Sequence, residues 1–363
     1  MADGHTAGPA IEARSLRRVF QERRRGRVVK EHVALDGIDL EVRPGECFGL
    51  LGANGAGKTT LIKILCTLLL PTSGEARVLG MDVQREPAAI RRRINMVSGG
   101  EHSGYGILTV RESLWLFSQL YGLSNAEAFQ RIDRLLKMVD LDGSVRVNKL
   151  STGMRQKMNF ARGFLNEPDV LFLDEPTLGL DVQTARRLRS FVREWVEERR
   201  KTVLLTTHYM MEADEICDRV AIISGGRILA CDTPANLKRG LRQERVVRLE
   251  LAGGAVAEAA AGVTRGDAAG GAARGGTGGA ADVLRRAVQD VPGVRRVTLS
   301  ALDGRVSARV HVESDGVLVQ LVSTIAELGF DLHGLEKQDP TLEDVFLALT
   351  GRRLDDEGGA VGR

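Results

Sequence analysis

Apolar runs of strand length alternate with stretches of helical periodicity from residue 11 to about residue 240. This alternation predicts an α/β layer on a mainly parallel sheet. The strand-like runs lie at residues 46–51, 93–97, 170–173, 202–206 and 219–224. Two helical stripes of apolar residues predict a helical insert at about residues 100–150. These stripes consist of Val110, Leu114, Phe117 and Leu120, and of Ile132, Leu135, Leu136 and Val139.

A second, smaller domain is expected at residues 241–350, with a tail at 351–363. It reads as an α+β domain of ferredoxin-like type, without the phosphate turn or metal-ligand cluster that a catalytic domain would need. Its predicted strands lie at 245–251, 294–299 and 306–312, and its predicted helices at 283–288, 317–328 and 342–349. Alanine and glycine dominate residues 252–281, and such a composition predicts a flexible insertion. Residues 1–10 are small and polar, so we expect them to be disordered.

Composition narrows the range of partners. The 51 basic and 48 acidic residues nearly balance, which argues against a general nucleic-acid binder. The densest basic run, at residues 23–27, is typical of a solvated loop, although contact with anionic lipid or with an acidic loop of a partner stays open.

The four cysteines form no CxxC pair and are expected to be reduced, mostly buried thiols. The longest apolar run, 64–70, ends at Pro71, so we expect no membrane crossing by this chain.

A glycine-rich turn follows the first apolar strand and precedes a helix predicted at 58–70. Glycines let the backbone approach a ligand with its N–H groups turned inward, and the helix adds the positive end of its dipole. Lys58 can reach the β- and γ-phosphates of a nucleotide, and the Thr59 hydroxyl suits Mg²⁺. Strand, turn and helix together predict a triphosphate-binding loop, made of Gly52, Ala53, Asn54, Gly55, Ala56, Gly57, Lys58, Thr59 and Thr60.

Two acids end the apolar strand at 170–173. At the edge of the sheet that carries the phosphate loop, Asp174 would hold Mg²⁺ directly or through water. Glu175 would orient and polarise the attacking water. Adjacent acids at a strand end are also an ordinary turn signal, but beside a triphosphate-binding loop the catalytic interpretation is favoured.

A short motif, Leu150-Ser151-Thr152-Gly153-Met154, precedes this acidic strand. Ser151 is a natural N-cap, and a helix start with a serine hydroxyl and a glycine N–H is suited to bind an anion. The motif resembles the LSGGQ signature of the ATP-binding subunit of an ABC transporter. The resemblance covers residues 11–240 and implies the P-loop NTPase fold of ABC ATPases, with ATP and Mg²⁺ as cofactors.

The resemblance implies roles for three further residues. Phe20 stands where the family places the aromatic residue that stacks on adenine, and Asp181 matches the D-loop at a dimer interface. His208 matches the switch histidine that contacts the γ-phosphate, and it would act with Lys58 and Glu175 in catalysis. The family also implies a head-to-tail dimer, in which each ATP lies between the phosphate loop of one copy and Ser151 and Gly153 of the other.

Two features depart from the family pattern. Thr152 and Met154 replace the usual glycine and glutamine of the signature, which puts the contact from the fifth position in doubt. Residues 99 and 100 are both glycine, where the family has a glutamine that contacts Mg²⁺ and water and senses the membrane partner; Glu101 could partly substitute. We expect an active ATPase with a modified coupling step.

The resemblance implies a separate membrane partner, an ABC-2 type permease, with this chain cytoplasmic and peripheral on the inner face of the membrane. The surface after residue 101 receives the permease in the family; Tyr105 and Trp115 could anchor that contact, although a core position is favoured for Trp115. The C-terminal extension resembles those of drug and antibiotic exporters, so export is expected. The alternatives are a soluble ABC ATPase acting on nucleic acid or ribosomes, an importer ATPase, and a nucleotide-binding scaffold without turnover.

Overall fold

The computed structural model describes most of the chain, in two compact units. The first comprises residues up to Leu237 together with those from Phe346, and the second Lys238–Val345. The described residues are 8–24, 27–98, 105–240, 245–252, 280–302, 305–338 and 340–351. Residues 99–101, most of the predicted flexible insertion, and nearly all of the predicted tail therefore lie outside them.

A six-stranded sheet of strand order β10-β9-β3-β8-β7-β6 forms the centre of the first unit. All its neighbouring strands pair in parallel except β10, which is antiparallel to β9 at one edge. The strands span Arg227–Asp232, Arg219–Ser224, Cys47–Leu51, Thr202–Thr207, Val170–Asp174 and Ile94–Ser98, in that order. The predicted parallel sheet is confirmed, because buried central strands need apolar residues on both faces.

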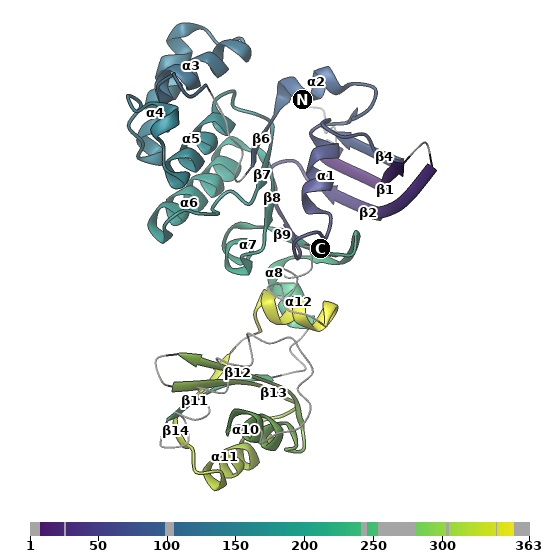
Figure 1. Cartoon of the computed structure of the whole chain (residues 1–363), viewed down its shortest axis with the longest axis vertical. Helices are drawn as coiled ribbons and strands as arrows, with labels where there is room; N and C mark the ends of the chain where they lie inside the picture. The colour runs from purple at the N-terminus through teal and green to yellow at the C-terminus, as the bar shows by residue number, and fades with distance from the viewer. Residues whose placement is uncertain are drawn as a thin grey trace, which may run out of the picture. The chain divides into compact units, whose positions relative to one another are not determined.

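A separate antiparallel sheet, which the alternating pattern did not predict, occupies the N-terminal part of this unit. Its strand order is β2-β1-β4-β5, with α1 packed between it and the central sheet (Figure 1). The strands span Arg27–Val42, Ile11–Arg24, Ser73–Val78 and Met81–Asp82, in that order. Ala10 is buried and its N–H donates to the carbonyl of Val42, so the packed chain begins one residue before the predicted boundary at 11.

Helix α1 spans Lys58–Leu65 and is shorter than predicted. Cys66 caps it, and Thr67 follows with a φ of 61°, a left-handed conformation that ends the helix. Leu68 and Leu70 are therefore exposed, and the predicted extension of the helix to residue 70 is wrong.

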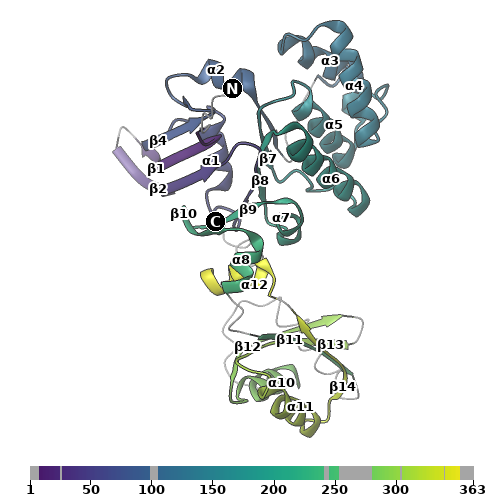
Figure 2. The same ribbon diagram turned by 180° about the vertical axis from the view of Figure 1, so that it is seen from behind.

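The helical insert forms as predicted and lies on the opposite side of the central sheet from the antiparallel sheet, as the two opposed views agree (Figures 1 and 2). Its helices α3 and α4 span Val110–Leu120 and Asn125–Val139, and each begins with a capping box, at Thr109 and Ser124. The remaining elements of the unit are α2 (Pro87–Arg93), η1 (Val147–Lys149), α5 (Thr152–Phe164), α6 (Val182–Arg199), α7 (Met210–Ile216) and α8 (Pro234–Gly240).

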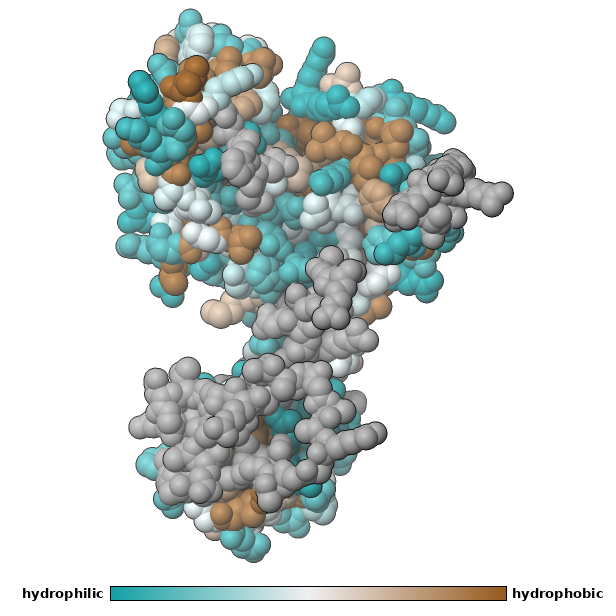
Figure 3. All heavy atoms as spheres, viewed as in Figure 1, coloured by the Kyte–Doolittle hydropathy of each residue, from teal (hydrophilic) through white to brown (hydrophobic). Residues whose placement is uncertain are grey.

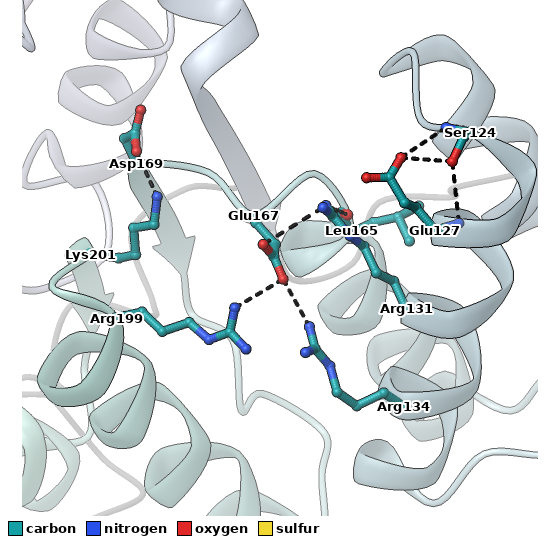
Figure 4. A network of polar contacts seen from close by, with 9 residues as sticks. All are labelled: Ser124, Glu127, Arg131, Arg134, Leu165, Glu167, Asp169, Arg199 and Lys201. Carbon is teal, nitrogen blue, oxygen red and sulfur yellow. Dashed lines mark hydrogen bonds and ion pairs between the residues drawn. The ribbon is translucent and has the colours of Figure 1, made fainter.

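One carboxylate joins the insert to the rest of the unit. Glu167, in the turn between α5 and β7, accepts hydrogen bonds of 3.0 Å from Arg134 of α4 and from Arg199 of α6 (Figure 4). Arg131 of α4 lies 3.7 Å from its other oxygen. This ion-pair cluster joins the middle of α4 to the C-terminal end of α6.

The second unit is an α+β layer. Its antiparallel sheet has the strand order β12-β13-β11-β14, and helices α10 and α11 cover one face (Figure 1). The elements in chain order are β11 (Arg245–Ala252), α10 (Ala280–Gln289), β12 (Val294–Leu302), β13 (Arg305–Val312), α11 (Val317–Glu327) and β14 (Asp331–Gln338). This β-α-β-β-α-β order is the ferredoxin-like arrangement. Strand β14 was not predicted, and α12 (Leu342–Thr350) follows it.

Three of the four cysteines, Cys47, Cys66 and Cys217, are buried free thiols, as predicted, whereas Cys231 on the edge strand β10 is exposed. Burial raises the pKa of the Cys66 thiol, and the negative charge of Asp174 adds to this effect. Among the described residues, no helix combines the length and the apolar character that a membrane span requires.

Candidate functional site

The glycine-rich turn joins β3 to α1 and is fixed by close backbone packing. A Cβ on Gly52 would lie 2.4 Å from the carbonyl oxygen of Ile223, so only glycine fits there. Gly57 has a φ of 110°, which side chains other than glycine rarely adopt. Sequence reasoning predicted this loop, and the structure gives it the tight backbone path that phosphate binding requires.

Lys58 is the first residue of α1, and its side chain is buried inside the turn. Its ammonium donates to the carbonyl oxygens of Gly52 at 2.6 Å and of Ala53 at 3.0 Å. These bonds hold the positive charge within the loop, at the end of the helix where the backbone N–H groups are free to face an anion.

Thr59 and Asp174 converge although they belong to α1 and β7. The Thr59 hydroxyl donates to Oδ2 of Asp174 at 3.0 Å, and the Thr206 hydroxyl donates to Oδ1 at 2.5 Å. The strand order places β8 between β3 and β7, so Thr206 bridges the phosphate-loop strand and the acidic strand. Sequence reasoning missed Thr206; the signal was a polar hydroxyl at the end of an otherwise apolar strand.

Glu175 and His208 form a second pair at the same edge of the sheet. Oε1 of Glu175 lies 3.2 Å from Nδ1 of His208, although no described residue forms a hydrogen bond with this nitrogen. Glu175 has a φ of 52°, and its N–H donates to the carbonyl of Thr206 at 3.0 Å. A non-glycine residue in the left-handed region is held there by its surroundings, and such strain is common at functional sites.

The signature residues lie on another element. Ser151 caps α5 and accepts from the N–H of Met154 at 3.2 Å. A Cβ on Gly153 would lie 3.4 Å from the carbonyl oxygen of Gly179, so the start of α5 packs beside the loop that follows β7. The structure thus gathers Lys58, Thr59, Asp174, Glu175 and His208 at one sheet edge, whereas Ser151 and Gly153 belong to the start of α5.

Asp181 and Phe20 belong to two further elements. Asp181 caps α6 and accepts from the backbone N–H and the hydroxyl of Thr184, and these bonds lower the pKa of its carboxyl. Phe20 lies on β1 of the antiparallel sheet, partly exposed, with the guanidinium of Arg18 4.5 Å from its ring centre.

The comparisons with known proteins agree with this arrangement. Residues 35–178 match the ABC transporter family. The chain is 35% identical to a daunorubicin resistance ATP-binding protein of Streptomyces coeruleorubidus, covering 96% of this chain and 97% of the relative. It is 37% identical to a daunorubicin/doxorubicin resistance ATP-binding protein of Streptomyces peucetius, covering 96% of this chain and 94% of the relative.

Solved structures of ATP-binding cassettes are also similar to part of this chain. A dimeric ATP-binding cassette in a post-hydrolysis state, bound to ADP and phosphate, aligns with 61% of this chain and 98% of its own, at a TM-score of 0.57 and 25% identity. The ATP-binding subunit of an ABC transporter aligns with 64% of this chain and 93% of its own, at a TM-score of 0.56 and 30% identity.

Proposed function

The chain belongs to the ABC transporter family, and from this premise we propose that it binds and hydrolyses ATP to power a separate membrane permease that exports a drug, an antibiotic or another small hydrophobic compound. The observation that carries the proposal is the convergence of two pairs, Thr59 with Asp174 and Glu175 with His208, at one sheet edge beside the phosphate loop. The relatives named for daunorubicin resistance support the export of a drug.

The chain's own groups account for nucleotide binding. The N–H groups of residues 52–60 and the ammonium of Lys58 would hold the phosphate oxygens. The ring of Phe20 would stack on the face of the adenine base. Any base can make this contact, because stacking uses only the π-face of the ring.

A magnesium ion fits the oxygens that the structure brings together. The Thr59 hydroxyl and the Asp174 carboxylate are hard oxygen donors within 3.0 Å of each other, and Mg²⁺ in nucleotide sites typically takes one or two protein oxygens, phosphate oxygens and waters. When bound there, the ion would neutralise charge that develops between the β- and γ-phosphates.

Hydrolysis would depend on Glu175 and His208. Glu175 would orient the attacking water and accept its proton, while His208, 3.2 Å away, would contact the γ-phosphate. Ser151, Gly153 and Asp181 would complete the site of a second copy in a head-to-tail dimer. The dimeric structural relative supports this arrangement.

Exposed apolar side chains on the helical insert support a permease-binding surface there (Figure 3). Trp115 is 36% exposed and its indole N–H donates to Asn125, so the prediction of a core position for Trp115 is wrong. The other exposed apolar side chains of the insert are Tyr105, Ile107, Leu120, Tyr121 and Phe129. We propose that an ABC-2 type permease binds this surface, which would make the chain a peripheral protein on the cytoplasmic side of the membrane, with the second unit in a regulatory or docking role.

Drug retention by sensitive cells tests the proposal. Cells that co-express the chain with an ABC-2 type permease should retain less of a hydrophobic drug such as daunorubicin than cells that express the permease alone. The Glu175→Gln chain, co-expressed at the same level, is the matched control and should not lower retention. Equal retention with both chains would count against ATP-driven export.

A further inference from the structure

The carboxyl end of β8 carries two neighbouring threonines whose hydroxyls bond in different directions. Successive side chains of a strand point to opposite faces of the sheet. Thr206 donates to Asp174, as described above, whereas the Thr207 hydroxyl donates to Oε2 of Glu212 at 2.8 Å. The second bond connects the strand that precedes His208 to helix α7.

Glu212 is only 4% exposed and uses its other oxygen for a second connection. Oε1 accepts a hydrogen bond from the hydroxyl of Thr177, and Nη1 of Arg189 lies 3.5 Å from the same oxygen. Thr177 is two residues beyond Glu175, and Thr207 is one residue before His208. One buried carboxylate therefore joins the loop that carries Glu175 to the strand end that carries His208.

The surrounding contacts make this connection stiff. Thr177 and Thr207 are themselves buried, so neither hydroxyl can exchange freely with water. The amide of Gln156 in α5 donates to the carbonyl of Pro176 at 2.8 Å, which fixes the same loop from the other side. A buried hydrogen-bond network that is fully satisfied rigidifies the segments it joins.

We propose that Glu212 is a positioning residue, which sets the separation of Glu175 and His208 through the hydroxyls of Thr177 and Thr207. Its two oxygens have a fixed span, so the two segments keep one spacing, and the left-handed backbone of Glu175 is held in place. The inference rests on the proposed roles of Glu175 and His208. Glu212 itself does not touch the reacting groups.

Steady-state ATPase kinetics of Glu212→Gln test the inference. Glutamine keeps the volume but replaces one acceptor oxygen by a donor and removes the charge that faces Arg189, so one of the two threonine hydroxyls can no longer donate to this side chain. We expect kcat to fall roughly 10- to 100-fold, because a small displacement of catalytic groups is enough for such a loss. KM for ATP should stay within about twofold, since Lys58 and the phosphate loop are untouched. An unchanged kcat, or an equal loss in nucleotide affinity and kcat, would overturn the inference.

Two matched sets of variants separate positioning from general destabilisation. Glu215 also pairs with Arg189, at 2.7 Å, but is exposed and bonds to neither threonine, so Glu215→Gln should keep full kcat. Thr177→Ser keeps the hydroxyl and should restore most of the rate that Thr177→Val loses. Equal rates for these two Thr177 variants, or an equal loss in Glu215→Gln and Glu212→Gln, would contradict the positioning role.

Glu175→Gln, measured alongside, distinguishes the two levels of the proposal. If Glu175→Gln is inactive and Glu212→Gln turns over normally, only the positioning role fails. If Glu175→Gln turns over normally, the catalytic assignment fails and the positioning role fails with it.

Discussion

Thr59 and Asp174 are 115 residues apart in the chain, yet the threonine hydroxyl donates directly to the carboxylate at 3.0 Å. Thr59 is the second residue of α1, the helix that follows β3, and Asp174 ends β7. Because the strands are parallel, their carboxyl ends meet at one edge of the sheet, and this topology brings distant motifs together.

Glu175→Gln should bind ATP and lose most of its turnover. The substitution keeps the shape of the side chain but removes the carboxylate that would polarise water. The ATP-bound protein should then accumulate as a dimer, since hydrolysis would no longer reopen it. ATPase rate and molecular mass by light scattering, with and without ATP, are the measurements. Turnover near that of the unaltered chain would remove this role from Glu175.

Lys58→Ala should weaken nucleotide binding itself. The ammonium held by the carbonyls of Gly52 and Ala53 is the positive charge buried in the loop. Besides the weaker binding, the loss of one such donor should lower the rate of ATP hydrolysis roughly 10²- to 10³-fold. Equilibrium binding of a fluorescent ATP analogue checks the expectation. Lys63, exposed on the same helix, supplies the control, and Lys63→Ala should bind normally. Similar affinity in both variants would contradict the phosphate-binding assignment.

Thr206→Val should raise the Mg²⁺ concentration needed for half-maximal ATPase by about 10-fold, because a lost partner of a metal-binding carboxylate typically weakens metal affinity by roughly 10- to 100-fold. The valine keeps the volume but leaves Oδ1 of Asp174 without its 2.5 Å donor. A Mg²⁺ titration at saturating ATP makes the measurement. Thr206→Ser keeps the hydroxyl and should respond like the unaltered chain; a shift of the same size in both variants would exclude the hydrogen bond as the cause.

Glu167→Gln should destabilise the first unit at neutral pH and much less in acid. Partial burial opposes ionisation of Glu167, but the hydrogen bond from Arg134 and the charges of Arg131 and Arg199 outweigh it and lower the pKa of the carboxyl below its usual 4.5. A carboxylate with a lowered pKa in the folded state stabilises that state above pH about 4.5, and this contribution disappears as the pH falls through the folded-state pKa.

The expected difference between the two proteins is about 1 kcal/mol at pH 7, because solvent screens a group of this exposure. Urea unfolding at pH 7 and at pH 4 measures the change. Glu198→Gln, exposed on α6 and outside the cluster, should show no such pH dependence. A stability difference for Glu167→Gln that stays constant between the two pH values would contradict the ion-pair explanation.

Much of the fold and site could be predicted from local patterns. The glycine turn, the acidic strand end and the capped signature helix are each marked by a few neighbouring residues, which is why they could be predicted. The structure has these elements at the expected positions. Helix α1 ended early because Thr67 adopts a left-handed conformation, which apolar spacing does not reveal. The antiparallel N-terminal sheet was missed although β1 and β2 form a hairpin, because many charged residues interrupt the apolar pattern of both strands and β4 pairs with β1 from far along the chain.

The hydroxyl contacts were the least predictable part of the site. Thr206, Thr207 and Thr177 resemble ordinary strand and loop residues until the fold brings the hydroxyl of each one to a carboxylate. Glu212 is one of several acids on a helix of seven residues, and nothing in the sequence around it distinguishes it from its neighbours. Contacts of this kind depend on tertiary geometry, and a single sequence holds no direct record of them.

The uneven burial of the cysteines provides a natural site for a chemical probe. Cys231 is the exposed thiol of the four, whereas Cys47, Cys66 and Cys217 are buried. Desolvation by its neighbours raises the pKa of Cys231, so coupling to a thiol-reactive dye should be carried out in mildly alkaline buffer. Donor and acceptor dyes attached there, one on each copy and without any engineered cysteine, would report the distance between two copies of the chain as ATP is added and consumed.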